Sequence, residues 1–331
     1  MADNKGLAKA KDTKFDEFFT QISEIEKEMK HYRQHFEGKI IFCNCDDPEY
    51  SNFWRYFQLN FYEFGLKKLI STHYDKEKPS YKMEIVATEA DRQIGIPDYV
   101  KTPLEGNGDF SSPECIEILK EADIIITNPP FSLFRKYIET LLKYNKKFII
   151  IGHSNALHYK EIFPLIRDNI LWLGNKPISG GMDMIIPEKD FDATKAKKYR
   201  VNKYGEKIVN VNGICWFSNL DIAKRHETMP LYKMYDPKEY PHYTNYDGID
   251  VADVNSIPID YYGAMGVPDS YLAKYNPDQF EILGLGCGNL AKQIGVGKNH
   301  RGRTDIAYLD ENGKPQCPFS RIIIRRKQNE N

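Results

Sequence analysis

The 331-residue chain lacks several features that would assign it to other protein classes. It contains no apolar run long enough to span a bilayer, and its polar, Lys-rich N-terminus is unlike a secretory signal. Its six cysteines are scattered. Cys43 and Cys45 are too close in sequence for a zinc-binding pair of the usual spacing, and no cluster of Cys or His residues elsewhere could supply the remaining ligands. We therefore expect a cytoplasmic protein with reduced thiols, no membrane association and no metal.

The chain also lacks a net excess of charge, since its formal charge is −1. This value excludes a protein that is basic all over, but local basic segments remain. Residues 291–327 hold nine Lys or Arg against three Asp or Glu, and residues 195–207 hold six against one. Segregated positive charge suits binding to a phosphate backbone, and it suits a solvated charged surface equally well.

Strand-like and helix-like segments alternate through the first half of the chain. Short β-branched or aromatic runs predict strands at 39–43, 67–72, 83–88, 124–127 and 147–152. Apolar spacing predicts helices at 14–36, 51–64, 113–121 and 133–143. This alternation predicts an α/β fold with a doubly wound, mostly parallel sheet.

The alternation weakens after residue 152. Later strands are predicted at 170–173, 182–186 and 214–217, where antiparallel pairing is expected. The chain beyond 219 is rich in Tyr, Pro, Asp and Asn and has few periodic segments. We divide the sequence into a disordered lead over 1–13, a main domain over 14–219 and a smaller, loop-rich region over 220–331.

The most informative segment is Asn128-Pro129-Pro130-Phe131, directly after an apolar strand. An exocyclic amino group on a planar ring is a poor nucleophile, because its lone pair is delocalised. The Asn128 side-chain oxygen and the Pro129 carbonyl can accept its two protons and draw the nitrogen towards a nucleophilic state. The prolines stiffen the turn, and Phe131 offers a face for an unstacked base. The segment predicts amino-group methylation; a strand that merely ends in a proline turn is the alternative.

Two segments could receive S-adenosylmethionine, the usual methyl donor for this chemistry. One is the acidic turn at 44–51, and the other is the Gly-rich run at 284–288. We favour the early turn, because only 43 residues follow Gly288, too few for the βα units that a permuted fold still requires. Asp109 and Phe110 could then bind the donor adenine, and Asp75 either reaches its ribose or is a surface acid.

With these residues in view, the chain resembles the EcoRI-type adenine-specific DNA methyltransferases. The resemblance covers essentially the whole chain. It is carried by the segments at 16–21, 42–48, 51–53, 65–70, 127–131 and 321–327. The run Cys-Asn-Cys-Asp-Asp-Pro-x-x-Ser-Asn-Phe is specific, whereas Asn-Pro-Pro-Phe is shared with enzymes that methylate RNA and protein.

The resemblance implies a fold of the S-adenosylmethionine-dependent methyltransferase type, in which the main domain is catalytic and the C-terminal region recognises the target. Asn128 to Phe131 would hold an adenine flipped out of duplex DNA, and its N6 would receive the methyl group by direct in-line transfer. The donor-binding residues would be Phe18, Phe19, Thr20, Asn44, Cys45, Asp46, Asp47, Pro48, Ser51, Asp109 and Phe110. The turn at 44–51 departs from the common pattern, because it has no Gly-x-Gly.

A basic loop at 297–303 is the predicted DNA contact. Lys298, Asn299, Arg301 and Arg303 are residue types that bind phosphates and base edges, and the flanking glycines allow close approach. A mobile basic loop is the alternative. The expected partner is double-stranded DNA, with GAATTC as a family-based first guess. The enzyme would belong to a restriction-modification system, whose endonuclease shares the site without direct contact, or act as an orphan modification enzyme.

Other activities remain compatible with the motifs. The same motif could activate the weakly nucleophilic amino group of cytosine N4, of a base in RNA or of a protein amide. Only the resemblance favours adenine in DNA. A non-catalytic DNA-binding protein of the same fold is a further alternative. The oligomeric state is left open.

Overall fold

The computed structural model describes residues 19–76, 80–88, 95, 97–186, 199–202 and 204–328. The chain forms two compact units: unit 1 comprises Met1–Ser154 and Gly174–Asp221, and unit 2 comprises Asn155–Leu173 and Ile222–Asn331. The sequence-based division differs from this one mainly in residues 155–173, which it placed in the main domain. The predicted lead over 1–13 and the predicted donor residue Phe18 lie outside the described residues.

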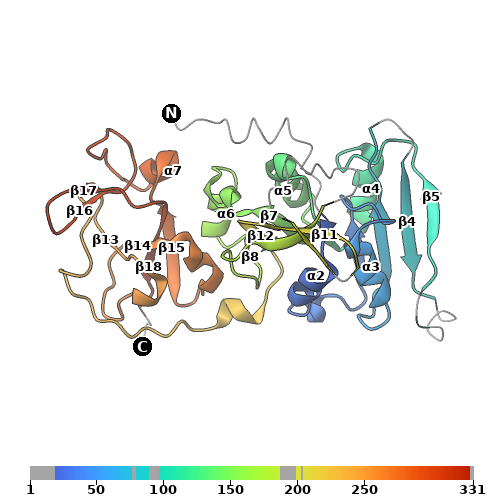
Figure 1. The fold of residues 1–331 in the computed structure, drawn as a ribbon, viewed down its shortest axis with the longest axis horizontal. Coiled ribbons are helices and arrows are strands. Elements are labelled where there is room, and N and C mark those ends of the chain that lie inside the picture. Colours follow the sequence, from blue (N-terminus) through green and yellow to red (C-terminus); the bar gives the residue numbers. More distant parts are fainter. Residues whose placement is uncertain are drawn as a thin grey trace. The chain divides into compact units, whose positions relative to one another are not determined.

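The main sheet of unit 1 has the strand order β5-β4-β3-β2-β6-β7-β12 (Figure 1). Its strands are β2 (Ile40–Cys43), β3 (Lys68–Thr72), β4 (Tyr81–Val86), β5 (Val100–Pro103), β6 (Ile124–Thr127), β7 (Lys147–His153) and β12 (Ile214–Ser218). The four central strands β3, β2, β6 and β7 run parallel, and β4, β5 and β12 are antiparallel to their neighbours. The sheet is therefore mixed rather than mostly parallel. A parallel β4 would need a longer crossover than the short link from β3 provides.

Helices cover both faces of this sheet. They are α2 (Ile22–Met29), α3 (Asn52–Leu59), α4 (Pro113–Glu121) and α5 (Phe134–Lys143). Trp216 and Phe217 point to opposite faces because they are neighbours on β12. Phe53 of α3 packs on Trp216 with ring centroids 5.9 Å apart, and Phe134 of α5 packs on Phe217 at 5.0 Å. Figure 1 accordingly shows α2 and α3 on one side of the sheet and α4 and α5 on the other.

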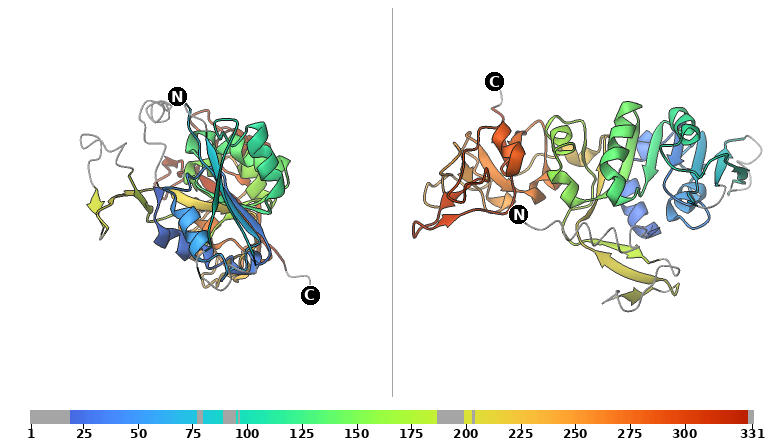
Figure 2. Two further views of the ribbon diagram at one scale, coloured as in Figure 1. Left: turned by 90° about the vertical axis from the view of Figure 1, so that its right-hand side faces the viewer. Right: turned by 90° about the horizontal axis from the view of Figure 1, so that it is seen from above.

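The helix predicted over 14–36 is wrong at both ends, since α2 covers only Ile22–Met29 and the separate 3-10 helix η1 (Arg33–His35) follows it. Phe19–Thr20 instead form strand β1, which pairs with β9 in the antiparallel sheet β1-β9-β11-β10. The other strands of that sheet are β9 (Met182–Ile185), β10 (Arg200–Val201) and β11 (Lys207–Val211), and Figure 2 shows β9 and β11 side by side. Strand pairing and a hydrogen bond from Asn52 Nδ2 to the Thr20 carbonyl (2.8 Å) outweigh the helical spacing of the apolar residues.

Unit 2 is more regular than its loop-rich sequence indicated. It contains a sheet of order β13-β14-β18-β15, in which β14, β18 and β15 are antiparallel, and a separate β16-β17 hairpin. The strands are β13 (Ile249–Asp250), β14 (Met265–Pro268), β15 (Phe280–Leu285), β16 (Tyr308–Leu309), β17 (Pro315–Gln316) and β18 (Arg321–Arg326). Unit 2 also contains the short helices α6 (Phe163–Arg167) and α7 (Gly288–Gln293) and the two-residue strand β8 (Trp172–Leu173).

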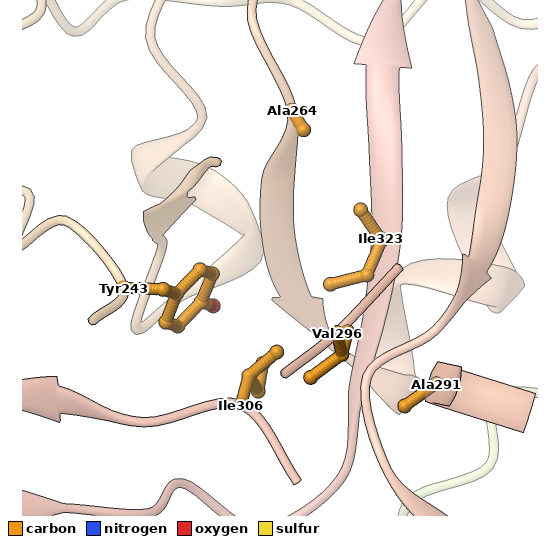
Figure 3. Packing of buried hydrophobic residues seen from close by; sticks show 6 residues of the cluster. All are labelled: Tyr243, Ala264, Ala291, Val296, Ile306 and Ile323. Carbon is orange, nitrogen blue, oxygen red and sulfur yellow. The ribbon is translucent and has the colours of Figure 1, made fainter. Parts of the chain in front are cut away.

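A cluster of buried side chains supports the basic loop at 297–303. Val296 precedes the loop and Ile306 follows it, and both pack with Ile323 of β18 (Figure 3). The remaining members of the cluster are Tyr243, Ala264 and Ala291. Both ends of the loop are thus held in the core of unit 2. None of the helices within the described ranges combines the length and the apolar character that crossing a membrane requires.

Candidate active site

The turn at 44–48 and the Asn-Pro-Pro-Phe segment lie at the carboxyl ends of adjacent parallel strands. Strand β2 pairs with β6 through Ile41–Ile124 and Phe42–Ile125. From β2 the chain passes to β3 on one side, and the later strand β6 lies on the other. Such a reversal of strand order creates a crevice where ligands bind in open α/β sheets. The two segments that carry the sequence argument therefore meet at the place where a ligand is expected.

The buried carboxylate of Asp46 connects these two segments. Its Oδ1 accepts a hydrogen bond from Ser51 Oγ (3.0 Å). Its Oδ2 accepts from the hydroxyl of Thr127 and from the backbone N–H of Asn128 (3.2 Å). Asp46 is only 6 % exposed, and this burial raises its pKa from 3.8 to about 6, although the three hydrogen bonds act in the opposite direction.

The neighbouring Asn44 is oriented by a tyrosine that the sequence analysis missed. Tyr137 of α5 donates its hydroxyl proton to Asn44 Oδ1. The other amide atom, Asn44 Nδ2, is buried and has no hydrogen-bond partner within the described residues. Phe110 packs edge-on against Tyr137, with ring centroids 5.1 Å apart. Tyr137 therefore contacts both Asn44 and Phe110, two of the predicted donor-binding residues.

The loop that carries Asp109 is shaped by local hydrogen bonds. Asp109 Oδ1 accepts from the backbone N–H of Ser111 (2.7 Å) and from its hydroxyl (2.6 Å). Gly108 has φ +77°, and a Cβ there would lie 1.8 Å from the His73 carbonyl oxygen. The half-buried Asp75 joins this loop through its N–H, which donates to the Asn107 carbonyl (3.1 Å).

A second set of contacts fixes the end of the acidic turn. Tyr81 donates its hydroxyl proton to Asp47 Oδ1 (2.7 Å), and the Tyr81 ring stacks on His73 at 4.9 Å. Ser71 Oγ lies 2.6 Å from the Asp46 carbonyl oxygen. Tyr81, His73 and Ser71 were not predicted as site residues, because no motif surrounds them. Their only sequence signal is their position at the ends of β3 and β4.

A cavity of about 740 Å³ lies beside the turn. Phe19, Pro48 and Ser51 of the predicted donor residues line it, together with aromatic side chains such as Trp54 and Tyr99. The remaining described members of the predicted donor set do not line it: Thr20, Asn44, Cys45, Asp46, Asp47, Asp109 and Phe110. The predicted residues are therefore distributed between the cavity and the crevice, with Pro48 and Ser51 at the boundary.

The Asn-Pro-Pro-Phe segment itself is a tight turn into a helix. Pro129 is buried, Asn128, Pro130 and Phe131 are half-buried, and Phe131 begins the 3-10 helix η3 (Phe131–Leu133) that leads into α5. The hydroxyl of Thr127 also accepts from the Cys45 N–H (3.1 Å). The turn is thus fixed to the end of β2 at both Cys45 and Asp46.

In unit 2, the basic loop displays three of its four predicted contact residues. Lys298, Arg301 and Arg303 are exposed, whereas Asn299 is only 8 % exposed. Asn299 Oδ1 accepts from the backbone N–H groups of Arg301 (2.8 Å) and Arg303 (3.2 Å). The side chain of Asn299 therefore points inward and shapes the loop, contrary to the prediction that it reaches phosphates or bases.

The Gly-rich run at 284–288 has a packing role. A Cβ at Gly284 would lie 2.6 Å from Ile294, and one at Gly286 would lie 2.8 Å from Ile306. The strand before the run, β15, is antiparallel to β18. Because a βα crossover needs parallel strands, this geometry supports the preference for the early turn.

The chain is similar to known methyltransferases along nearly its whole length. A family model described as adenine-specific methyltransferase EcoRI matches residues 6–327. Type II methyltransferase M.EcoRI from Escherichia coli is 42% identical over 99% of this chain and 98% of its own length. M.MgeORF184P from Mycoplasma genitalium is 40% identical over 83% of this chain and 84% of its own. M.MpnI from Mycoplasma pneumoniae is 34% identical over 97% of this chain and 98% of its own length. No solved structure gives a significant match.

Proposed function

This chain belongs to the EcoRI family of adenine-specific methyltransferases and is a site-specific adenine methyltransferase of DNA, and from this premise we propose how it acts. The methyl group comes from S-adenosylmethionine and is transferred to N6 of an adenine that has been turned out of duplex DNA. The main sheet then serves as the doubly wound sheet of this methyltransferase class. Unit 1 carries the chemistry, and unit 2 recognises the target.

The observation that supports this proposal best is the triple contact of Asp46. One carboxylate accepts from Ser51, from Thr127 and from the Asn128 N–H. It therefore fixes the turn after β2 against the turn after β6. Methyl transfer requires donor and acceptor in a defined geometry, and much of the rate enhancement comes from such positioning.

Asn128 and Pro129 carry out the polar part of the reaction. The Asn128 side-chain oxygen and the Pro129 carbonyl accept hydrogen bonds from the two N6–H groups and make the nitrogen more nucleophilic. Pro129 and Pro130 lack N–H donors and restrict φ, so that the carbonyl direction is preset. Phe131 stacks on the extruded base, which offsets part of the cost of unstacking it.

The residues around the acidic turn fit S-adenosylmethionine. The buried Asn44 Nδ2 is a donor that lacks an acceptor in the described residues, and the ligand offers carboxylate and adenine acceptors. The cavity beside Phe19, Pro48 and Ser51, which aromatic and polar side chains line together, receives further portions of the same ligand, and Asp109 and Phe110 bind its adenine. S-adenosylmethionine would supply a methyl group on a positively charged sulfur, and this sulfur would leave as a neutral thioether when the adenine nitrogen attacks the methyl carbon.

Unit 2 contributes the DNA contact through Lys298, Arg301 and Arg303, while Asn299 holds their loop in shape. The preferred sequence is expected to be short, and GAATTC is the first site to test. A restriction endonuclease that reads the same site would cleave DNA that this protein has not methylated, without contacting this protein.

The reaction is tested by methyl transfer from labelled S-adenosylmethionine to unmethylated duplex DNA, followed by nucleoside digestion and mass spectrometry. Label in N6-methyladenine supports the proposal, and sequencing of the marked sites then gives the specificity. Label in N4-methylcytosine would contradict the proposed acceptor. Absence of label in DNA, with the donor still bound, would contradict the DNA substrate and direct the search to RNA and protein.

A further inference from the structure

Phe319 is the most exposed large apolar side chain in the described residues, with 86 % of its surface accessible. It lies in unit 2 between Pro318 and Ser320, just before strand β18. An exposed aromatic residue alone is common on protein surfaces. What distinguishes Phe319 is the set of hydrogen bonds that hold its backbone and its neighbours in the sequence.

A buried ion pair holds one side of Phe319. Arg321 Nη1 donates to the Phe319 carbonyl (3.1 Å). The same guanidinium contacts both carboxylate oxygens of Asp250, at 2.9 and 3.4 Å, and Tyr243 donates its hydroxyl proton to Asp250 Oδ1 (2.8 Å). Tyr243 belongs to the buried cluster of Figure 3, so this network connects Phe319 to the core of unit 2.

Two further contacts hold the flanking residues. Ser320 Oγ lies 2.8 Å from His158 Nε2, which also lies 2.9 Å from Asp269 Oδ2. Asn299 Nδ2 donates to Cys317 Sγ (3.5 Å). The segment around Phe319 is therefore tied directly to the residue that shapes the basic loop.

The basic loop supplies the charge that an isolated aromatic residue lacks. Lys298, Arg301 and Arg303 are exposed on a loop whose ends, Val296 and Ile306, are buried together. Duplex DNA combines a negatively charged backbone with a stack of planar bases. An exposed apolar side chain on a segment that is hydrogen-bonded to a cationic loop has the features of the wedges by which proteins unstack and kink DNA.

We propose that Phe319 is a DNA wedge, which inserts between bases while Lys298, Arg301 and Arg303 hold the phosphates. The inference rests on the proposed function, since it names the part of unit 2 that disturbs the duplex. Because hydrogen bonds already hold the Phe319 carbonyl and residues on either side of it, insertion of the ring costs less conformational freedom than it would from an unconstrained loop.

The test compares Phe319→Ala with Tyr232→Ala, which removes another aromatic residue of unit 2 with 81 % exposure. Once the methylated site is mapped, duplexes with 2-aminopurine at or beside the target adenine report unstacking by fluorescence. We expect Phe319→Ala to abolish the fluorescence increase and to weaken specific binding by about tenfold to hundredfold. Phe319→Trp should restore both, and Tyr232→Ala should change neither.

A second readout separates the wedge from the phosphate contacts. Phe319→Ala should leave the slope of DNA affinity against salt unchanged, because it removes no charge. An unchanged fluorescence response and affinity in a folded Phe319→Ala variant would overturn the inference, while the proposed function would stand if the wild-type protein methylates DNA. Failure of the wild-type protein to bind or methylate DNA would instead overturn the proposed function. Intact DNA binding with loss of self-association in Phe319→Ala would also refute the wedge, assigning the residue to contact with a second copy.

Discussion

At the scale of single residues, Asp46 couples the site to pH. Its pKa in the folded protein, about 6, exceeds the ordinary value of 3.8, chiefly because of burial. The folded state therefore binds more protons than the unfolded state between these values, and the free energy of unfolding falls as pH rises through that range. The contribution of Asp46 to stability is thus fully present below pH 3.8 and lost above about pH 6.

The first prediction is that Asp46→Asn removes this pH dependence. Two pKa units correspond to about 3 kcal/mol, so the wild-type and variant unfolding free energies should diverge by up to about that amount between acidic and neutral pH. Denaturant unfolding at several pH values from 4 to 7 measures the difference. Parallel profiles for the two proteins would show that Asp46 does not titrate in this range.

The second prediction concerns Asn128, whose side-chain oxygen is proposed to accept a hydrogen bond from N6 of the adenine. Asn128→Ala should lower the rate of methyl transfer by about a hundredfold to a thousandfold, in line with the loss of one preorganised polar contact. Binding of donor and DNA should persist. Single-turnover transfer and separate binding titrations measure these quantities. Ser132→Ala, an exposed change in the same turn, is the matched control; full activity in Asn128→Ala would refute the site assignment.

At the scale of elements, the loop between β5 and α4 depends on one glycine. Gly108 adopts φ +77°, and any side chain would collide with the backbone of His73. By contrast, a Cβ at Gly106 would meet nothing closer than Glu114 Oε2, at 3.8 Å. Position 106 can therefore accept a side chain, whereas position 108 cannot. Asp109 directly follows the position that cannot.

The third prediction follows from this contrast. Gly108→Ala should lower the free energy of unfolding by about 1–3 kcal/mol through backbone strain and the steric collision. It should also weaken binding of the donor, because Asp109 and Phe110 move with the loop. Thermal unfolding and donor titration test both effects, with Gly106→Ala as the control. Equal behaviour of the two variants would show that the loop accommodates a side chain at position 108.

At the scale of the whole molecule, a chain with net charge −1 must concentrate positive charge in order to bind DNA. The fourth prediction is that Arg301→Glu combined with Arg303→Glu weakens DNA binding steeply. It should also reduce the slope of log affinity against log salt by about 2, or about one per lost phosphate contact. Fluorescence anisotropy at several salt concentrations gives the slope. Lys233→Glu combined with Lys238→Glu, two exposed changes elsewhere in unit 2, controls for the same change in net charge. Unchanged affinity in the Arg301→Glu/Arg303→Glu variant would refute the loop assignment.

Much of the local structure was predictable, because it depends on neighbouring residues. Helix α4 has the predicted bounds, since Ser112 caps it and Pro113 fits the first turn. The prediction of strand β6 before Asn128 is likewise confirmed. Where local pattern misled, a distant partner intervened: Phe19–Thr20 pair with Met184 and Ile185 and therefore leave the predicted helix.

The sequence by itself determined the family, the order of the main elements and the Asn-Pro-Pro-Phe turn, since each is written in contiguous residues. Only the tertiary structure decided that Asp46 joins Ser51, Thr127 and Asn128, and that Asn299 turns inward. It also decided the antiparallel pairing of β4 and β5 at one edge of the main sheet. Burial, hydrogen-bond partners and shifted pKa values depend on contacts between segments that are distant in the sequence. A local sequence pattern does not specify those contacts.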